Sequence, residues 1–308
     1  LHYKNIKKVK SQHLVLFSYI RMIHLHVDLD TPHVLHRFYQ GEKSDNVISD
    51  EYCQILLARM AEFFSKHDVK ATLFVITQDL MLARYSSLLK ELSNMGHEIA
   101  SHSHTHPYLS GNLEHHFKTL KKEIRRSRQE IEKIFHISPL GFRAPSYLIN
   151  MDVINTLISE GYRYDGSYLR SIFSPALGFA AYLKGGANKS FGTQSSLKID
   201  QKYGSGNFMM FPVPTCCGFP IYNNFFLSSP DIFKKLIFFL GTTRHYSPYL
   251  FHLIEFVDYK EDKKYLSSAV CKHPNLKKPI KERLDSMGEM VSFLKKQGDI
   301  CLTKDRFQ

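Results

Sequence analysis

The sequence predicts an α/β fold built around a parallel sheet. Short apolar runs rich in β-branched and aromatic residues alternate along the chain with stretches whose apolar residues recur at helical spacing. The chain has 308 residues, of which 43% are hydrophobic, which is enough for the core of one large α/β domain. Because no fixed-period repeat and no linker divides the sequence, we expect one domain over residues 22–308.

The strands and helices can be placed from these runs in chain order. We expect strands at residues 23–27, 71–76, 98–101, 140–143, 162–167 and 249–255. Helices are expected at residues 51–66, 86–94, 113–135, 151–160, 231–240 and 281–296. Gly96 and Gly161 follow two of these helices and are typical helix stops.

Two segments do not follow this alternation. Residues 1–21 have a basic start and a short apolar run without a small-residue cleavage site, so we treat them as an extension outside the fold. Residues 172–224 are rich in Gly, Ser, Pro and aromatic residues, and we interpret them as long loops over one face of the domain. Packing against the domain is the favoured role of these aromatic side chains, and stacking on a sugar or at a membrane interface is the alternative.

The composition limits the compartment and the partners. A net charge of +12 and a pI near 9.3 indicate either a basic enzyme surface or an anionic partner, such as a phospholipid surface. The five cysteines have no CxxC spacing, which favours a reducing, cytoplasmic location over a disulfide framework, with the inner membrane face as an alternative. No run reaches the ~18 apolar residues of a membrane-spanning helix.

Two carboxylates lie at the end of the first predicted strand. Asp28 and Asp30 are two residues apart, so on a strand they share one face. The carboxyl edge of parallel strands is where α/β folds place their ligands. Two solvated loop aspartates are the alternative interpretation of this pair.

Three histidines follow the predicted strand at residues 98–101. His102, His104 and His106 lie within five residues, and imidazole is the usual protein ligand for borderline-soft divalent metals such as Zn²⁺. Histidines four apart reach one ion on a helical turn or where a strand bends into a loop. With Asp30, His102 and His106 form a three-ligand set with an open position, as catalytic zinc sites have.

Three further segments each end a strand-like run. They are Gly-Phe-Arg-Ala-Pro-Ser-Tyr at residues 141–147, Tyr-Asp-Gly-Ser at residues 164–167, and Leu-Phe-His-Leu at residues 250–253. Each segment alone is weak, because an arginine at a strand end or a histidine on an apolar strand usually has a structural role. Their order after the aspartate pair and the histidines is specific.

Taken together, the five segments resemble the polysaccharide deacetylases of carbohydrate esterase family 4. The resemblance runs from about residue 23 to the end of the chain and implies a distorted (β/α)₇ barrel with its site at the carboxyl face. The residues of the motifs are most similar to those of deacetylases of exopolysaccharide or lipid-linked sugar metabolism in the cell envelope. The Asp-x-Asp form is also similar to deformylases of lipid-linked aminoarabinose.

The resemblance implies a role for each motif residue. Asp30, His102 and His106 would bind a divalent metal, with Zn²⁺ expected and Co²⁺, Mn²⁺ or Ni²⁺ as alternatives. Asp28 would be the general base, and Arg143 would hold it ionised. His252 would protonate the leaving amine, and Asp165 would orient His252. These roles agree with the chemistry, since an amide needs a polarised carbonyl and a protonated leaving amine.

The motifs depart from the family pattern at three places. Leu29 separates the two aspartates, which are adjacent in many relatives. The sequence Arg-Ala-Pro-Ser-Tyr shifts the tyrosine by one residue, so the expected backbone oxyanion donor is an N–H at Ser146 or Tyr147. The chain has no tryptophan, and the aromatic or apolar side chain that lines the acyl pocket would come from a nearby residue: Tyr168, Leu169 or Phe173.

We therefore expect a metal-dependent amidohydrolase that removes an acetyl group from an N-acylated saccharide, in a polymer or a lipid-linked form. A deformylase, or a hydrolase of another small amide, is the alternative on the same fold. A carbohydrate- or nucleic-acid-binding protein is the non-enzymatic alternative. The basic helix at residues 118–128 is the feature that favours nucleic acid, although no nucleic-acid-binding module is present and we expect no such partner.

Overall fold

The computed structural model describes residues 22–40, 49–107, 113–168, 208–213, 215–216, 219–220 and 246–307. The predicted extension at residues 1–21, the predicted helix at residues 231–240 and most of the loop region at residues 172–224 lie outside the described residues. The following paragraphs concern the described part of the chain.

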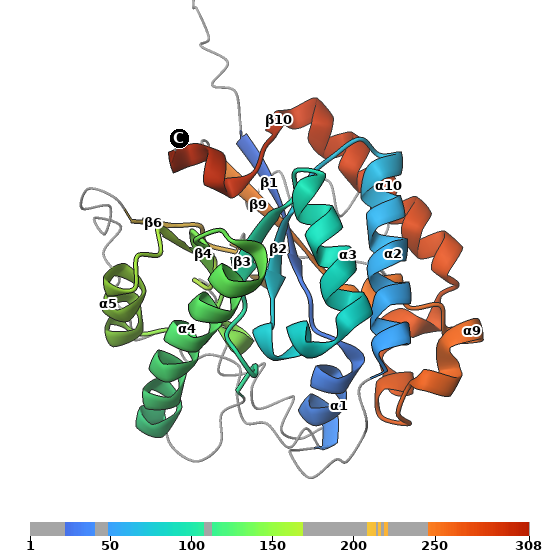
Figure 1. Ribbon diagram of the computed structural model, residues 1–308. Helices are drawn as coiled ribbons and strands as arrows, with labels where there is room; N and C mark the ends of the chain where they lie inside the picture. The colour runs from blue at the N-terminus through green and yellow to red at the C-terminus, as the bar shows by residue number, and fades with distance from the viewer. Residues whose placement is uncertain are drawn as a thin grey trace, which may run out of the picture.

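A parallel sheet forms the centre of the molecule (Figure 1). Seven strands lie side by side in the order β9 (Tyr246–His252), β1 (Met22–Asp28), β2 (Thr72–Val75), β3 (Glu98–Ser101), β4 (Gly141–Phe142), β5 (Tyr164–Asp165) and β6 (Met209–Met210). Each pair of neighbours is parallel, as the alternating sequence pattern predicts. The sheet has the strand arrangement of the predicted (β/α)₇ barrel.

An eighth strand, β10 (Asp299–Ile300), pairs with the start of β1. The carbonyl of Ile23 accepts a hydrogen bond from Cys301 N, and Leu29 N donates to the carbonyl of Phe74 in β2. Odd-numbered residues of β1 direct these backbone groups to one side, so β10 and β2 lie on the same side of β1, at its opposite ends. β9 takes the other side along the full length of β1.

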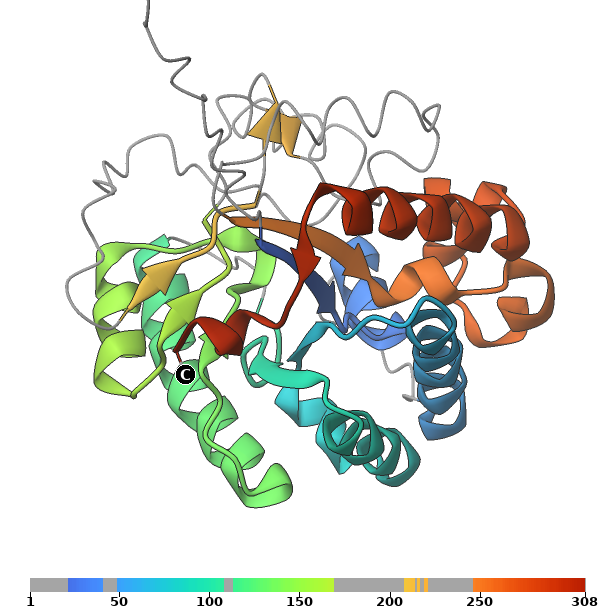
Figure 2. The same cartoon turned by 90° about the horizontal axis from the view of Figure 1, so that it is seen from above.

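Helices cover the outside of the sheet, as the view from above shows (Figure 2). They are α1 (Pro32–Gln40), α2 (Asp50–Lys66), α3 (Ala83–Asn94), α4 (Leu113–Phe135), α5 (Met151–Ser159), α9 (Tyr259–Asp262) and α10 (Ile280–Gln297). The 3₁₀ segments are η1 (Thr77–Met81), η2 (Pro145–Tyr147), η4 (Leu253–Phe256), η5 (Lys263–Tyr265), η6 (Val270–Lys272), η7 (Pro274–Lys277) and η8 (Thr303–Phe307). β7 (Thr215–Cys216) and β8 (Phe219–Pro220) form a separate antiparallel pair. None of the helices in the described ranges is both long and apolar enough to span a bilayer.

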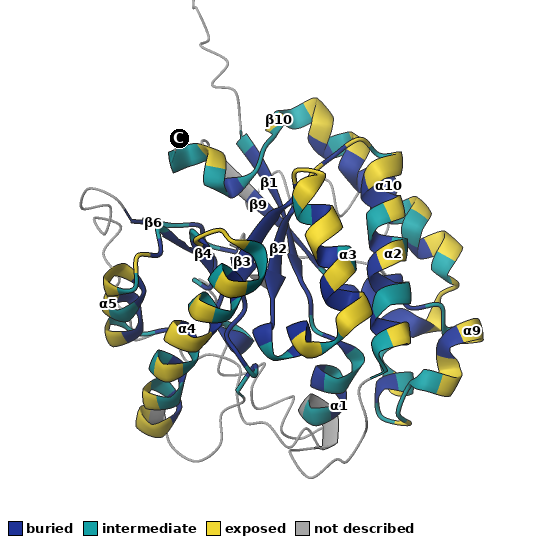
Figure 3. Cartoon of the chain, in the orientation of Figure 1, coloured by how far each residue is buried: buried dark blue, intermediate teal, exposed yellow. Residues whose placement is uncertain are grey.

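The two faces of β1 bury different kinds of side chain. Ile23, Leu25 and Val27 pack into the main apolar core with residues of α2 and α10. The side chains between them, His24, His26 and Asp28, are also buried, and they point to the barrel interior because successive residues of a strand face opposite ways. Figure 3 shows the central strands buried and the exposed residues on the outer faces of the helices.

Segment η8 covers the barrel interior at the amino-terminal ends of the strands. Thr303 lies 2.8 Å from His26, from its Oγ1 to the imidazole Nε2, and Lys304 N donates to the Glu98 carboxylate at 3.0 Å. The Phe307 ring stacks on Tyr164, with 5.9 Å between centroids. The carboxyl-terminal ends of the strands lie at the other end of the barrel, where the predicted site residues gather.

Candidate active site

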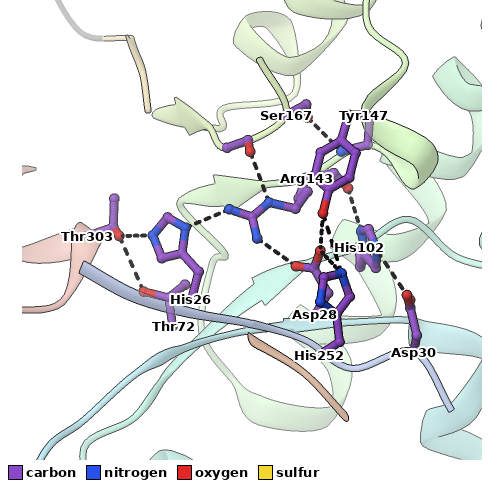
Figure 4. A network of polar contacts seen from close by, with 12 residues as sticks. His26, Asp28, Asp30, Thr72, His102, Arg143, Tyr147, Ser167, His252 and Thr303 are labelled. Atoms are coloured by element: carbon purple, nitrogen blue, oxygen red, sulfur yellow. Dashed lines mark hydrogen bonds and ion pairs between the residues drawn. The ribbon is translucent and has the colours of Figure 1, made fainter. Parts of the chain in front are cut away.

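Most of the predicted site residues come from the ends of four barrel strands, β9, β1, β3 and β4. Asp28 ends β1 and His252 ends β9, and these two residues are directly paired in the sheet register. Arg143 follows β4, and His102 follows β3. Because parallel strands end at the same edge of a sheet, these side chains meet at one end of the barrel (Figure 4).

Asp30, His102 and His106, here named the metal triad, converge on one point. The Nε2 atoms of His102 and His106 lie 3.4 Å and 3.5 Å from Asp30 Oδ1. Three potential ligand atoms, one from each residue, all lie within 4.8 Å of one another. The structure therefore brings the three predicted metal ligands together.

The loop after β3 gives the two histidines their positions. His102 Nδ1 lies 2.8 Å from the carbonyl oxygen of Arg143, and since a carbonyl only accepts, this nitrogen carries a proton. His106 has a left-handed backbone with φ of 55°, and its N–H donates to Ser103 Oγ at 3.0 Å. His104 points elsewhere, with its Nδ1 2.9 Å from Thr77 Oγ1, as expected for a residue that does not bind the metal.

The electrostatics of the metal triad fit a cation. Burial lowers the pKa of His106 to about 3, so this ring is neutral and offers a lone pair. Burial opposes the charged form of His102, but the carboxylates of Asp28 and Asp30 outweigh it and raise the pKa of that ring. Asp30 Oδ1 is buried without a hydrogen-bond donor among the described residues. One proton can join this oxygen to a single imidazole, whereas a divalent cation satisfies both rings and the carboxylate.

Asp28 and Arg143 form the predicted ion pair, and both side chains are buried. Arg143 Nη1 donates to Asp28 Oδ1 at 2.7 Å, its Nε donates to the carbonyl of Gly166 at 2.9 Å, and its Nη2 donates to His26 Nδ1 at 2.6 Å. The guanidinium also lies over the Phe74 ring, 4.2 Å from its centroid. All sides of Arg143 are thereby fixed, and one oxygen of Asp28 is fixed with it.

His26 is a site residue that the sequence analysis missed. Because a guanidinium only donates, His26 Nδ1 accepts, and Nε2 carries the proton that is shared with Thr303 Oγ1. Burial and the adjacent Arg143 hold the pKa of His26 well below its ordinary value. The available signal was the alternation His24, His26, Asp28, which places two histidines on the face that carries the aspartate.

Asp165 has a different contact from the one predicted. It accepts hydrogen bonds from the backbone N–H and the hydroxyl of Ser167, whose Oγ in turn accepts from Ala144 N at 2.7 Å. Burial raises the pKa of Asp165 to about 6. No contact with His252 is present among the described residues. Asp165 lies on β5, which four strands separate from β9 in the sheet order, and it fixes the loop that holds Arg143.

The His252 ring lies beside the second oxygen of the Asp28 carboxylate. Its Nε2 lies 3.8 Å from Asp28 Oδ2, the carboxylate oxygen that Arg143 does not bind. Burial lowers the pKa of His252, which favours the neutral ring in the resting protein. This placement agrees with the predicted role of a group that delivers a proton beside the base.

The predicted backbone oxyanion donor at Tyr147 is wrong. Tyr147 N donates to the carbonyl of Ala144 at 3.0 Å within the turn η2, so it is not directed to a substrate. Ser146 and Tyr147 both have left-handed backbones, with φ of 54° and 59°, and both side chains are half-buried. This geometry directs the Tyr147 hydroxyl into the site, 3.4 Å from both Asp28 Oδ2 and His252 Nε2. Of the predicted pocket residues, Tyr168 is described, while Leu169 and Phe173 lie outside the described residues.

Comparison with known proteins agrees with this fold. Residues 50–164 match the family model for polysaccharide deacetylase. This part of the chain therefore carries a polysaccharide deacetylase domain. Among curated proteins, it is 25% identical over 142 residues to the peptidoglycan deacetylase of Helicobacter pylori, a match that covers 44% of this chain and 46% of that protein. It is 28% identical over 99 residues to the uncharacterized protein YlxY of Bacillus subtilis, covering 32% of this chain and 30% of that protein.

The likeness extends to a solved structure. A protein of Mycobacterium smegmatis that is assigned as a polysaccharide deacetylase superposes with a TM-score of 0.52 at 14% identity, covering 89% of this chain and 85% of that one. At this identity the likeness shows the fold. The chain spans less than half the length of each curated relative it matches, and Asp28, Asp30 and His252 lie outside the region that matches the family model.

Proposed function

We propose that this polysaccharide deacetylase relative hydrolyses the N-acetyl group of an acylated sugar with the help of a divalent metal. One observation supports this most strongly. The metal triad, the Asp28–Arg143 ion pair and His252 come from separate strands and meet at the carboxyl end of the barrel. A ligand set, a carboxylate base and an imidazole within a few ångströms are the groups that amide hydrolysis requires.

The residues divide the reaction between them. A divalent ion on Asp30, His102 and His106 would polarise the acyl carbonyl and lower the pKa of water. Asp28 accepts the proton of the attacking water through Oδ2, because Oδ1 is occupied by Arg143. His252 lies on the other side of Oδ2 and supplies the proton that the amine needs when the carbon–nitrogen bond breaks.

The details of metal and substrate are part of the proposal. Two imidazoles and one carboxylate suit Zn²⁺, and Co²⁺, Mn²⁺ or Ni²⁺ are the alternatives. The peptidoglycan deacetylase of Helicobacter pylori supports an acetylated saccharide as the substrate class. A lipid-linked sugar, a formyl in place of the acetyl group, and a cytoplasmic location at an anionic membrane face remain hypotheses that rest on motif wording, basic charge and cysteine use.

Metal analysis combined with product analysis tests the proposal. The purified protein should contain about one divalent ion per chain and release acetate from one member of a panel of N-acetylated sugars and glycan fragments. Asp30→Ala should lose both the ion and turnover, since it removes the oxygen that faces both imidazoles. Asp285→Ala, an exposed aspartate on α10, is the matched control and should retain both.

The possible results separate the candidate activities. Formate without acetate would favour the deformylase. Full metal content and full activity in Asp30→Ala would exclude the metal triad as the metal site.

A further inference from the structure

We infer that the Tyr147 hydroxyl carries the proton of the attacking water from Asp28 to His252, from which it reaches the leaving amine. The inference rests on the proposed function and concerns the same site. It assigns a function to a side chain that the motif comparison did not indicate.

The first argument is geometric. Asp28 Oδ2 and His252 Nε2 lie 3.8 Å apart, which is too long for a direct hydrogen bond. The Tyr147 hydroxyl lies 3.4 Å from each of them (Figure 4). Hydrogen bonds between catalytic groups are often long before substrate is bound and shorten in the complex. A hydroxyl both accepts and donates, so it can join a carboxyl group to an imidazole.

The second argument is that Arg143 occupies one oxygen of Asp28 and leaves the other oxygen toward the site. Arg143 binds Asp28 Oδ1 at 2.7 Å, and its remaining nitrogens bind Gly166 and His26. Only Oδ2 of this carboxylate therefore faces the site. The His252 ring turns its Nε2 toward the same oxygen from the adjacent strand. The base and the acid are thus held on either side of one hydroxyl.

The third argument is the backbone that presents the tyrosine. Ser146 and Tyr147 are consecutive non-glycine residues in the left-handed region, a conformation that costs of order 1–3 kcal/mol per residue. The turn is held by the Tyr147 N–H on the carbonyl of Ala144, so the backbone is fixed and the side chain is directed to the site. Such strain persists where the surrounding structure enforces it, and it is frequent at active sites.

The proton transfer balances within the hydrolysis. Water loses a proton to Asp28 Oδ2 as its oxygen bonds to the acyl carbon. The carboxylic acid then gives this proton to the Tyr147 oxygen while the hydroxyl gives its own to His252 Nε2. The imidazolium gives its proton to the nitrogen as the carbon–nitrogen bond breaks. The products are a carboxylic acid and an amine, and all three side chains return to their starting state.

The test compares an amide with an ester that needs no proton on its leaving group. In Tyr147→Phe, the kcat for the N-acetylated sugar should fall about 100-fold, in the range of lost acid–base catalysis. The kcat/KM for 4-nitrophenyl acetate should stay within about threefold of the wild-type value, because 4-nitrophenolate leaves unprotonated. His252→Ala should show the same selectivity. Tyr259→Phe on α9, which loses an equivalent hydroxyl on an outer helix, is the control and should retain both activities.

Two results would overturn the inference. An equal loss on amide and ester would make Tyr147 a donor to the oxyanion, and no loss on either would give it no part in the reaction. A measurement that needs no turnover keeps the inference separate from the proposed function. The ¹⁵N resonance of His252 Nε2 should shift in Tyr147→Phe, because the substitution removes the hydroxyl that this nitrogen contacts. If this resonance is unchanged in Tyr147→Phe, the relay is rejected, even in a protein without deacetylase activity.

Discussion

At the scale of single residues, Asp28 shows how neighbours determine the role of a carboxylate. Asp28 and Asp30 are two positions apart, yet one is paired with a guanidinium and the other faces two imidazoles. Arg143 is anchored by Gly166 and His26, so the ion pair is rigid. This arrangement supports the proposal that Asp28 is the base and Asp30 a metal ligand.

Asp28→Asn should separate metal binding from catalysis. Asparagine keeps the shape of the side chain and an oxygen that accepts from Arg143, but it takes no proton from water. We expect the metal content to be unchanged and the kcat for deacetylation to fall by about 10²-fold or more. Metal analysis and acetate release on the same sample provide the measurement, and turnover near the wild-type rate would remove Asp28 from its proposed role.

The sequence was informative about the candidate metal ligands and less so about the residues that hold the site in place. Asp30, His102 and His106 meet as predicted because the identity of a ligand and its place at a strand end determine most of its environment. The contacts of Asp165 and the Tyr147 backbone depended on a turn with two left-handed residues. Nothing in Ala-Pro-Ser-Tyr requires that conformation locally, because serine and tyrosine adopt it only when tertiary contacts enforce it.

At the scale of elements, the predicted strands are confirmed and several of their ends differ. Residues 98–101 and 113–135 form a strand and a helix with the predicted bounds. The strand predicted at residues 249–255 lies at 246–252, and its last part is the turn η4. The helix α1 and the strands β6 and β10 were not predicted. For the two strands the reason is their length, since two residues carry too little periodicity to be recognised.

The short strand β4 requires a residue without a side chain at Gly141. A Cβ on Gly141 would lie 2.0–2.5 Å from atoms of the Tyr164 ring, which is itself buried and stacked on Phe307. Gly141→Ala should therefore destabilise the fold by about 1–3 kcal/mol, as measured by urea unfolding. Tyr164→Leu in the same chain should recover part of that loss, and a double variant whose loss equals the sum of the two single losses would argue against the clash.

At the scale of the whole molecule, buried histidines link stability to pH. Burial lowers the pKa of His24, His97 and His273 to about 4. Between pH 6.5 and about 4, the unfolded chain binds protons at these rings and the folded protein does not, so stability falls as the pH decreases through this window. The raised pKa of Asp165 acts in the opposite direction, so a single-residue comparison is needed.

His97→Asn should isolate one of these contributions. The ring lies before β3 and accepts the N–H of Ala71, a bond that asparagine can retain in part. In urea unfolding from pH 7.5 to 5, the stability gap between wild type and variant should narrow as the pH decreases, by up to about 1.4 kcal/mol per pH unit. A gap that stays constant across this range would mean that His97 does not remain neutral in the fold.

The position of η8 also has a consequence for how the protein is made. Thr303 binds His26 across a separation of 277 residues, and Lys304 meets Glu98 at the same end of the barrel. While residues beyond 300 are still inside the ribosome, the nascent chain has buried histidine and glutamate side chains without their partners. The interior can then be completed only once residues 303–307 have emerged, so we expect the polypeptide to depend on chaperones until that moment, more than a protein whose core is built from residues close in sequence.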